Sequence, residues 1–230
     1  MLALVGSGEY LPEMETVDRF LLDELGTPPK VICLPTAAGS EGPQRIAYWS
    51  ELGANYFERL GASVEALPII TRQDAQNSNL ATRVKEANFI YLSGGRPDYL
   101  LKTLQDSLVW QAIQDVLMRG GILAGCSAGA MILGRWIPGF PGMKPAFNLL
   151  EGAIVMPHFD EIPNWMVRLI LVWVVRRGRM VGVPGFTALV VNENTCRVVG
   201  KGNVTIWDRS GKQDYIPGDL LAWSTRTTRG

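Results

Sequence analysis

Short runs of aliphatic and β-branched residues alternate along the chain with longer segments whose apolar residues recur every three or four positions. The short runs predict buried strands and the longer segments predict amphipathic helices. The expected strands are Leu2–Val5, Lys30–Leu34, Ser63–Leu67, Phe89–Leu92, Ile122–Ala124 and Ala153–Met156. The expected helices are Glu13–Leu25, Gln44–Leu60, Ala81–Glu86, Tyr99–Leu104, Val109–Arg119 and Trp165–Arg177. This alternation is typical of an α/β fold with a mostly parallel sheet and helices on both faces.

The pattern changes near the C-terminal end. Three short runs follow one another without a helix between them, which predicts a short antiparallel C-terminal edge: Ala188–Val191, Arg197–Val199 and Val204–Trp207. A segment rich in Gly and Pro, Pro138–Pro145, is expected to form a loop. No repeat, linker or shift in composition divides the chain. We therefore expect residues 1–230 to form a single α/β domain.

Composition limits the partners that the protein is expected to have. The 22 Lys and Arg residues balance 22 Asp and Glu residues, so no net positive charge favours nucleic acid. Charged residues are 19% of the chain, below the usual ~25%. The run Leu169–Val175 is apolar on nearly all sides of a helix but too short to span a membrane. Together these features predict a homodimer or larger homo-oligomer that does not bind a membrane.

Neither a signal peptide nor a CxxC pair is evident in the sequence. The first strand begins at the second residue, and Cys33, Cys126 and Cys196 are widely separated. These features predict a cytoplasmic protein without disulfides.

The segment Gly125-Cys126-Ser127-Ala128-Gly129 lies between an expected strand and a helix, where the Gly-x-Ser-x-Gly pattern indicates a nucleophile elbow. Glycines on either side of the serine remove Cβ atoms that would clash in this sharp turn. The hydroxyl of Ser127 then projects from the carboxyl end of the sheet, beside the Ala128 N–H as an oxyanion donor. The glycines bracket Ser127 and not Cys126, so Ser127 is the predicted nucleophile. A plain Gly-rich turn is the alternative.

His158 is the sole histidine, and it follows the expected strand Ala153–Met156. It should therefore emerge at the same edge as Ser127 and act as its general base. One histidine and scattered cysteines cannot supply a zinc site, so no metal is expected. Gly6-Ser7-Gly8 lacks the third glycine of a dinucleotide fingerprint, because position 11 is Leu11, and no cofactor is expected.

With Pro157-His158-Phe159 downstream of the Gly125–Ala130 turn, the chain resembles the dipeptidase E / cyanophycinase family of serine peptidases. That family has a fold similar to that of the class I glutamine amidotransferases. Further matches occur in the same order at Gly6–Glu9, Leu34–Ala38, Ser93–Gly95, Thr187–Val191 and Gly200–Thr205. The resemblance implies that Ser127 is the nucleophile and His158 the base. It also implies an oxyanion hole formed by Gly94, Gly95 and Ala128.

The acid of the family's catalytic triad is not evident. Cyanophycinases carry it just before a Thr-Ala pair, where this chain has Gly185, and dipeptidases carry it soon after the serine. No Asp or Glu occurs between Ser127 and Glu151. The remaining candidates are Asp160, Glu161 and Glu193, with Glu9 as a further carboxylate to examine.

The residues after His158 also differ from those of cyanophycinases. The arginines that follow His-Phe in those enzymes are absent from Asp160–Trp165, which makes cyanophycin a poor substrate. Arg96 follows the Gly94-Gly95 pair and could hold a substrate carboxylate with its planar fork, or be a solvated loop arginine.

Two hypotheses follow. The first is a serine hydrolase that cleaves a small peptide or amide through an acyl-enzyme at Ser127. The second is a catalytically impaired relative that binds a small molecule in the same pocket. An acid within hydrogen-bond reach of His158 favours the first hypothesis, because such an acid orients the imidazole and stabilises its charged form.

Overall fold

The computed structural model describes residues 1–139, 142–163, 165, 167, 171 and 178–223. The helix expected at Trp165–Arg177 and the apolar run Leu169–Val175 lie mostly outside the described residues.

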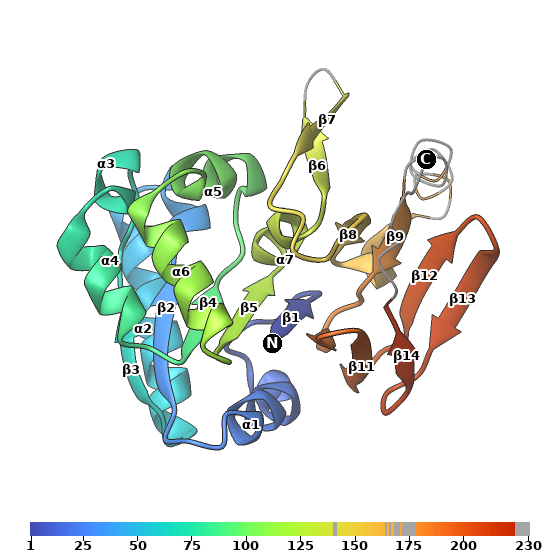
Figure 1. Cartoon of the computed structure of the whole chain (residues 1–230), viewed down its shortest axis with the longest axis horizontal. Helices are drawn as coiled ribbons and strands as arrows, with labels where there is room; N and C mark the ends of the chain where they lie inside the picture. The colour runs from blue at the N-terminus through green and yellow to red at the C-terminus, as the bar shows by residue number, and fades with distance from the viewer. Residues whose placement is uncertain (140–141, 164, 166, 168–170, 172–177, 224–230) are drawn as a thin grey trace.

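The largest sheet has eight strands in the order β14-β11-β10-β1-β5-β4-β2-β3 (Figure 1). Five of them are parallel: β1 (Leu2–Val5), β5 (Ile122–Cys126), β4 (Phe89–Leu92), β2 (Lys30–Leu34) and β3 (Ser63–Ala66). Three antiparallel strands complete it: β10 (Thr187–Asn192), β11 (Thr195–Gly200) and β14 (Leu220–Ala222). The predicted α/β class is confirmed.

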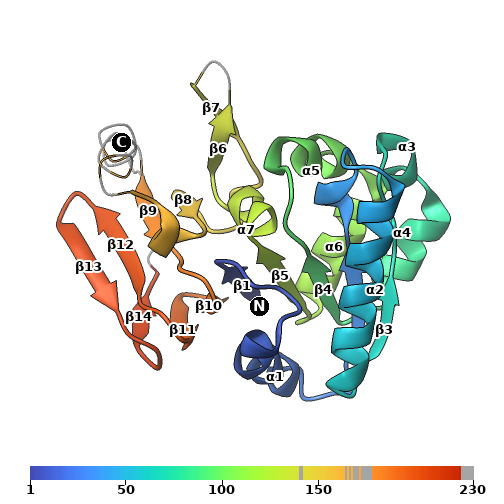
Figure 2. The same ribbon diagram turned by 180° about the vertical axis from the view of Figure 1, so that it is seen from behind.

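Helices cover both faces of this sheet because its buried strands are apolar on both sides. Leu4 packs on one face, and its neighbours Ala3 and Val5 pack on the other, as the period of two in a strand requires. One face is covered by α3 (Arg72–Ala75), α4 (Ser78–Lys85), α5 (Pro97–Leu104), α6 (Leu108–Met118) and α7 (Ala128–Leu133). The other is covered by α1 (Glu15–Glu24) and α2 (Pro43–Arg59), with α2 in front of the sheet in Figure 2.

A second sheet has four strands in the order β13-β12-β9-β8. They are β13 (Gly211–Tyr215), β12 (Val204–Asp208), β9 (Arg179–Gly182) and β8 (Ala153–Met156). The expected C-terminal edge is therefore divided: the runs at 188–191 and 197–199 extend the large sheet, whereas the run at 204–207 pairs with β9 and β13. The pairings of β10 with β1 and of β12 with β9 join strands that do not follow one another in the chain, and hydrophobic periodicity carries no information about such pairings.

The segment Pro138–Pro145 was expected to be a loop and instead forms a hairpin. Its strands are β6 (Trp136–Gly139) and β7 (Gly142–Pro145), which project away from both larger sheets (Figure 1). Both strands are edges, where a proline need not donate a ladder hydrogen bond. The prolines therefore do not exclude strand structure here.

The parallel strands bring several loops to one edge of the large sheet. Val5 is paired with Cys126, and Leu92 with Gly125, so the segments after β1, β4 and β5 begin side by side. This edge carries most of the predicted site. In the described part of the chain, no helix has the length and apolar character needed to cross a membrane.

Candidate active site

Ser127 occupies a strained turn between β5 and α7. Its backbone has φ 49° and ψ −109°, which a residue with a side chain rarely adopts. A Cβ on Gly125 would lie 2.5 Å from the Gly129 carbonyl oxygen, and one on Gly129 would lie 2.5 Å from the Leu92 carbonyl oxygen. Both positions therefore require glycine. The turn has the sharp strand-to-helix geometry that the sequence predicted.

The hydroxyl of Ser127 lies beside the imidazole of His158, with 3.0 Å between Oγ and Nε2. His158 also has a left-handed backbone, with φ 52°, between β8 and the short 3₁₀ helix η3 (Phe159–Glu161). The strand β8 belongs to the second sheet and not to the sheet that carries Ser127. Two elements from different sheets thus bring the two residues into hydrogen-bond contact.

Of the three candidate acids, Glu161 is the one that contacts the imidazole. Its Oε1 lies 3.2 Å from His158 Nδ1, because the turn of η3 places residues three apart on the same side. The Glu161 side chain is 66% exposed and that of His158 is 41% exposed, so water screens this contact.

Asp160 makes a different contact. Its Oδ1 accepts a hydrogen bond of 2.9 Å from the Gly185 N–H. A Cβ on Gly185 would lie 3.5 Å from Asp160 Oδ2 and 3.0 Å from Ser7 Oγ. Asp160 is therefore next to the position where the family resemblance places the acid, yet its hydrogen-bond partner is the Gly185 amide and not the imidazole.

The structure excludes Glu193 as the partner of His158. Glu193 lies in the turn after β10, whose residue Val191 pairs with Leu2 at the start of β1. Ser127 follows Cys126, which pairs with Val5 at the other end of β1. Since β10 is antiparallel to β1, the turn with Glu193 is at the opposite edge of the sheet.

Three of four successive amides in the loop after β4 are anchored. The Ser93 N–H donates to the Leu34 carbonyl at 3.3 Å, and the Arg96 N–H donates to the Ala37 carbonyl at 2.9 Å. The Gly94 N–H donates to Oε1 of Glu9 at 2.8 Å. The expectation that Gly94 is an oxyanion donor is therefore not met in this structure. The Gly95 and Ala128 N–H groups have no acceptor among the described residues, so both stay candidates.

Arg96 stands at the start of α5 with its side chain 61% exposed. Its Nε lies 3.7 Å from Oδ1 of Asp98, close to the limit for an ion pair. A contact between Arg96 and a substrate carboxylate remains a prediction.

Glu9 is the residue whose contacts sequence reasoning missed. It is 8% exposed, and its Oε2 lies 3.0 Å from Sγ of Cys126 while Oε1 holds Gly94. Burial, together with the charge of Glu9, raises the pKa of the Cys126 thiol well above its usual range. Cys126 therefore stays protonated and fully buried with its thiol against Glu9, which favours Ser127 as the nucleophile. The position of Glu9 directly after β1 could have indicated its place at this edge.

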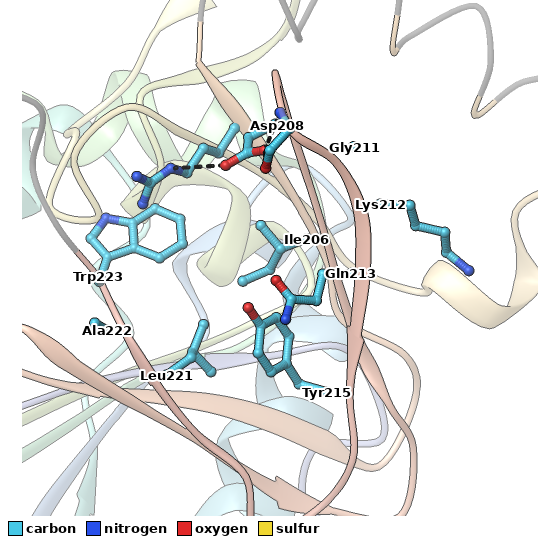
Figure 3. Close-up of a pocket in the computed structure, with 11 residues that line it drawn as sticks. Ile206, Asp208, Gly211, Lys212, Gln213, Tyr215, Leu221, Ala222 and Trp223 are labelled. Atoms are coloured by element: carbon cyan, nitrogen blue, oxygen red, sulfur yellow. Dashed lines mark hydrogen bonds and ion pairs between the residues drawn. The ribbon is translucent and has the colours of Figure 1, made fainter.

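Two cavities differ in their relation to this edge. One of about 500 Å³ adjoins the His158 segment and is lined by Phe159, Asp160, Gly185, Phe186 and Lys201 among others. Another of about 230 Å³ lies between the β12–β13 hairpin and residues 221–223, with Gln213 and Tyr215 in its wall (Figure 3). The second cavity contains none of the predicted site residues. Within the described ranges, no group of three or more His, Cys, Asp or Glu side chains could hold a metal.

The chain was compared with known proteins. The model of peptidase family S51 matches residues 2–199. The cyanophycinase of Trichormus variabilis is 31% identical over 183 residues, which are 68% of this chain and 58% of that protein. This chain thus spans less than two thirds of that relative. An uncharacterised peptidase of Listeria monocytogenes is 29% identical over 139 residues, covering 59% of this chain and 65% of that protein.

Solved structures give a closer match in length. The crystal structure of a peptidase from an acI-B1 actinobacterium aligns with a TM-score of 0.88 and 36% identity, covering 96% of each chain. A putative peptidase E protein from Listeria monocytogenes aligns with a TM-score of 0.65 and 22% identity, covering 87% of this chain and 98% of that one. The second likeness is one of fold.

Proposed function

Because this chain belongs to peptidase family S51, we propose that it is a serine-type hydrolase of small peptides or amides, with Ser127 as nucleophile and His158 as base. The observation that carries this proposal is the 3.0 Å contact between Ser127 Oγ and His158 Nε2, made at a strained turn between two obligatory glycines. Backbone strain of this kind costs about 1–3 kcal/mol and is concentrated at functional sites.

The reaction proceeds by acyl transfer. His158 Nε2 takes the proton of the Ser127 hydroxyl as Oγ attacks the substrate carbonyl carbon. The N–H groups of Gly95 and Ala128 donate to the oxygen that becomes negative. His158 then gives the proton to the leaving amine, which departs. In the second half, His158 takes a proton from water as the water oxygen attacks the acyl carbon, and returns that proton to Ser127 Oγ as the carboxylic acid product leaves.

Glu161 supplies the acid of this mechanism. When Nε2 accepts the serine proton, Nδ1 carries the other ring hydrogen and donates it to Oε1 of Glu161 at 3.2 Å. The carboxylate then favours the tautomer and offsets the charge that the imidazole gains. Because Glu161 is 66% exposed, this support is weaker than that of a buried acid.

The same exposure favours a second candidate function, a catalytically impaired relative that binds a small molecule in the same pocket. Among the described carboxylates, none that is buried contacts the imidazole. In either case the partner is a small molecule, and the cavity of about 500 Å³ beside Asp160 is large enough to hold part of it.

We also infer a cytoplasmic homo-oligomer with a fold like that of the class I glutamine amidotransferases. The low charged share and the apolar run Leu169–Val175 support self-association, and the lack of disulfide pairing supports the compartment. All three described cysteines are buried and free.

Labelling with a fluorophosphonate probe tests the proposed nucleophile. We expect the parent to be modified at Ser127 and the Ser127→Ala variant to be inert, since the probe reports an activated serine hydroxyl. Cys126→Ser keeps a donor toward Glu9 and removes the thiol, so it should be labelled like the parent. Mass mapping of the modified peptide identifies the residue. Labelling that persists in Ser127→Ala would refute the assignment, and an unlabelled, inactive parent would favour the binding function.

A further inference from the structure

Glu9 is an acidic residue placed under the loop that faces Ser127. It joins two segments distant in sequence, because Oε1 accepts from Gly94, 85 positions away, and Oε2 faces Cys126, 117 positions away. A side chain that is 8% exposed loses most of its hydration, and these two contacts replace it. The proposed reaction assigns no proton or bond to Glu9.

The Glu9 carboxylate and the Ser127 side chain both lie close to the position that a side chain on Gly94 would occupy. A Cβ on Gly94 would lie 2.6 Å from Glu9 Oε1 and 3.3 Å from Ser127 Cβ. Both side chains therefore border the same side of Gly94, where a Cβ would displace the carboxylate. A shift of Glu9 would be transmitted to the loop and to the space beside the hydroxyl.

The pattern of amide hydrogen bonds shows what Glu9 contributes to the loop. The N–H groups of Ser93 and Arg96 donate to main-chain carbonyls. The Gly94 N–H between them is held by a side chain, that of Glu9. Because the N–H groups of residues 93, 94 and 96 already have acceptors, the Gly95 N–H is the amide of this loop that can donate to a substrate. Gly95 has φ 138°, and a Cβ there would lie 2.6 Å from the Ala37 carbonyl oxygen, so its backbone is tightly confined.

We propose that Glu9 is a positioning residue, which holds the loop through the Gly94 N–H so that the Gly95 N–H is fixed as an oxyanion donor beside Ser127. This inference rests on the proposed function. A donor held in place before the reaction stabilises the transition state more than the bound substrate, so its loss lowers kcat more than it raises KM.

Two substitutions at position 9 introduce side chains about as long as that of Glu. They separate the role of the oxygen that accepts from Gly94 from the role of side-chain volume. Glu9→Gln keeps a carbonyl oxygen that can accept from Gly94, whereas Glu9→Met fills the space without an acceptor. Glu9→Ala is a second removal variant in case Glu9→Met does not fold. Asp18→Asn is the matched control, because Asp18 is a fully buried carboxylate that accepts a hydrogen bond from Tyr56 and not from Gly94.

Three measurements are made on each full-length variant. The hydrogen-exchange rate of the Gly94 amide, measured by nuclear magnetic resonance, reports the hydrogen bond between Gly94 and Glu9 whether or not the protein is active. Hydrolysis kinetics and the rate of fluorophosphonate labelling read the oxyanion hole. We expect Glu9→Met to exchange Gly94 faster and to lose about 10²–10³ in kcat with little change in KM. Glu9→Gln and Asp18→Asn should retain the parent's Gly94 exchange and its labelling rate within about threefold.

The possible results distinguish this inference from the proposed function. Unchanged Gly94 exchange in Glu9→Met overturns the inference and leaves the hydrolase assignment intact. Faster exchange with unchanged kcat and labelling also overturns it, because the loop would then be held without consequence for the reaction. A parent that neither turns over nor reacts with the probe overturns the proposed function, and the inference with it. Equal losses in kcat for Glu9→Gln and Glu9→Met would indicate a role of charge and contradict a positioning role.

Discussion

At the scale of single residues, the site consists of two side chains held by unusual backbone angles. Ser127 and His158 both have positive φ, and neither is glycine. Such conformations are unfavourable for the local backbone, and they persist where contacts with the surrounding structure outweigh that cost. Glu161, the proposed third member, has no such constraint, and it contacts His158 through one exposed turn of a 3₁₀ helix.

This exposure leads to a prediction for Glu161. Glu161→Gln keeps an oxygen that can accept from His158 Nδ1 but removes the negative charge, so we expect kcat to fall by about tenfold. Loss of a fully buried acid would cost about 10⁴. Glu193→Gln is the control at the opposite edge of the sheet and should match the parent. Steady-state hydrolysis of one peptide substrate measures both. A loss in Glu193→Gln as large as that in Glu161→Gln would contradict this assignment.

The sequence predicted some of these residues and not others for a physical reason. Ser127 and His158 could be predicted because glycine spacing and position after a strand are local signals. Glu161 was one of three equal candidates, since side-chain orientation on a short helix leaves no trace in the sequence. The contact between Glu9 and Gly94 depends on the pairing of strands far apart in the chain, which no local pattern encodes.

At the scale of elements, α1 and α2 are joined across the sheet face by a buried hydrogen bond. The Tyr56 hydroxyl donates to Asp18 Oδ2 at 2.8 Å, while Oδ1 has no partner among the described residues. Burial raises the pKa of Asp18 to about 7, although the bond from Tyr56 opposes this shift. Between the ordinary pKa of an aspartate and about 7, the folded protein therefore holds a proton that the unfolded chain does not.

Stability should consequently fall as pH rises across that interval, because the unfolded state binds fewer protons. Asp18→Asn cannot ionise, so we expect it to be more stable than the parent at pH 8, by an amount on the order of 1–3 kcal/mol, and close to the parent at pH 4. Tyr56→Phe should be destabilised more at pH 8 than at pH 4, since the hydroxyl stabilises the charged form. Urea unfolding at both pH values measures these differences. Equal differences at the two pH values would show that Asp18 does not titrate in this range.

The order of elements was largely predictable, and their assembly was not. The predicted strands Leu2–Val5, Lys30–Leu34 and Phe89–Leu92 have the observed bounds, because buried parallel strands are continuous apolar runs ended by Gly or Pro loops. The strand β13 (Gly211–Tyr215) has no apolar run, and its pairing with β12 stabilises it. Hydrophobic patterns indicate which residues are buried, so they do not predict an exposed strand that is held mainly by backbone hydrogen bonds to its neighbour.

At the scale of the whole molecule, the prediction concerns assembly. The low share of charged residues and the run Leu169–Val175 lead us to expect a homodimer or larger oligomer at micromolar concentration. Light scattering coupled to size-exclusion chromatography measures the mass directly. Substituting Val172→Lys within the run should shift that mass toward the monomer, and Lys144→Glu on the β6–β7 hairpin is the surface control. A monomer for the parent at that concentration would contradict the expectation.

The proposed nucleophile and the proposed base belong to two separate sheets. Ser127 follows a strand of the eight-stranded sheet, and His158 follows a strand of the four-stranded sheet. A contact of 3.0 Å between them demands that the two sheets keep their mutual alignment to a fraction of an ångström. If one sheet slid against the other, Ser127 Oγ and His158 Nε2 would move apart while the hydrogen bonds within each sheet stayed intact. Such a shift would abolish the proposed reaction without breaking any strand pairing, so activity reports how precisely the two sheets are held against each other.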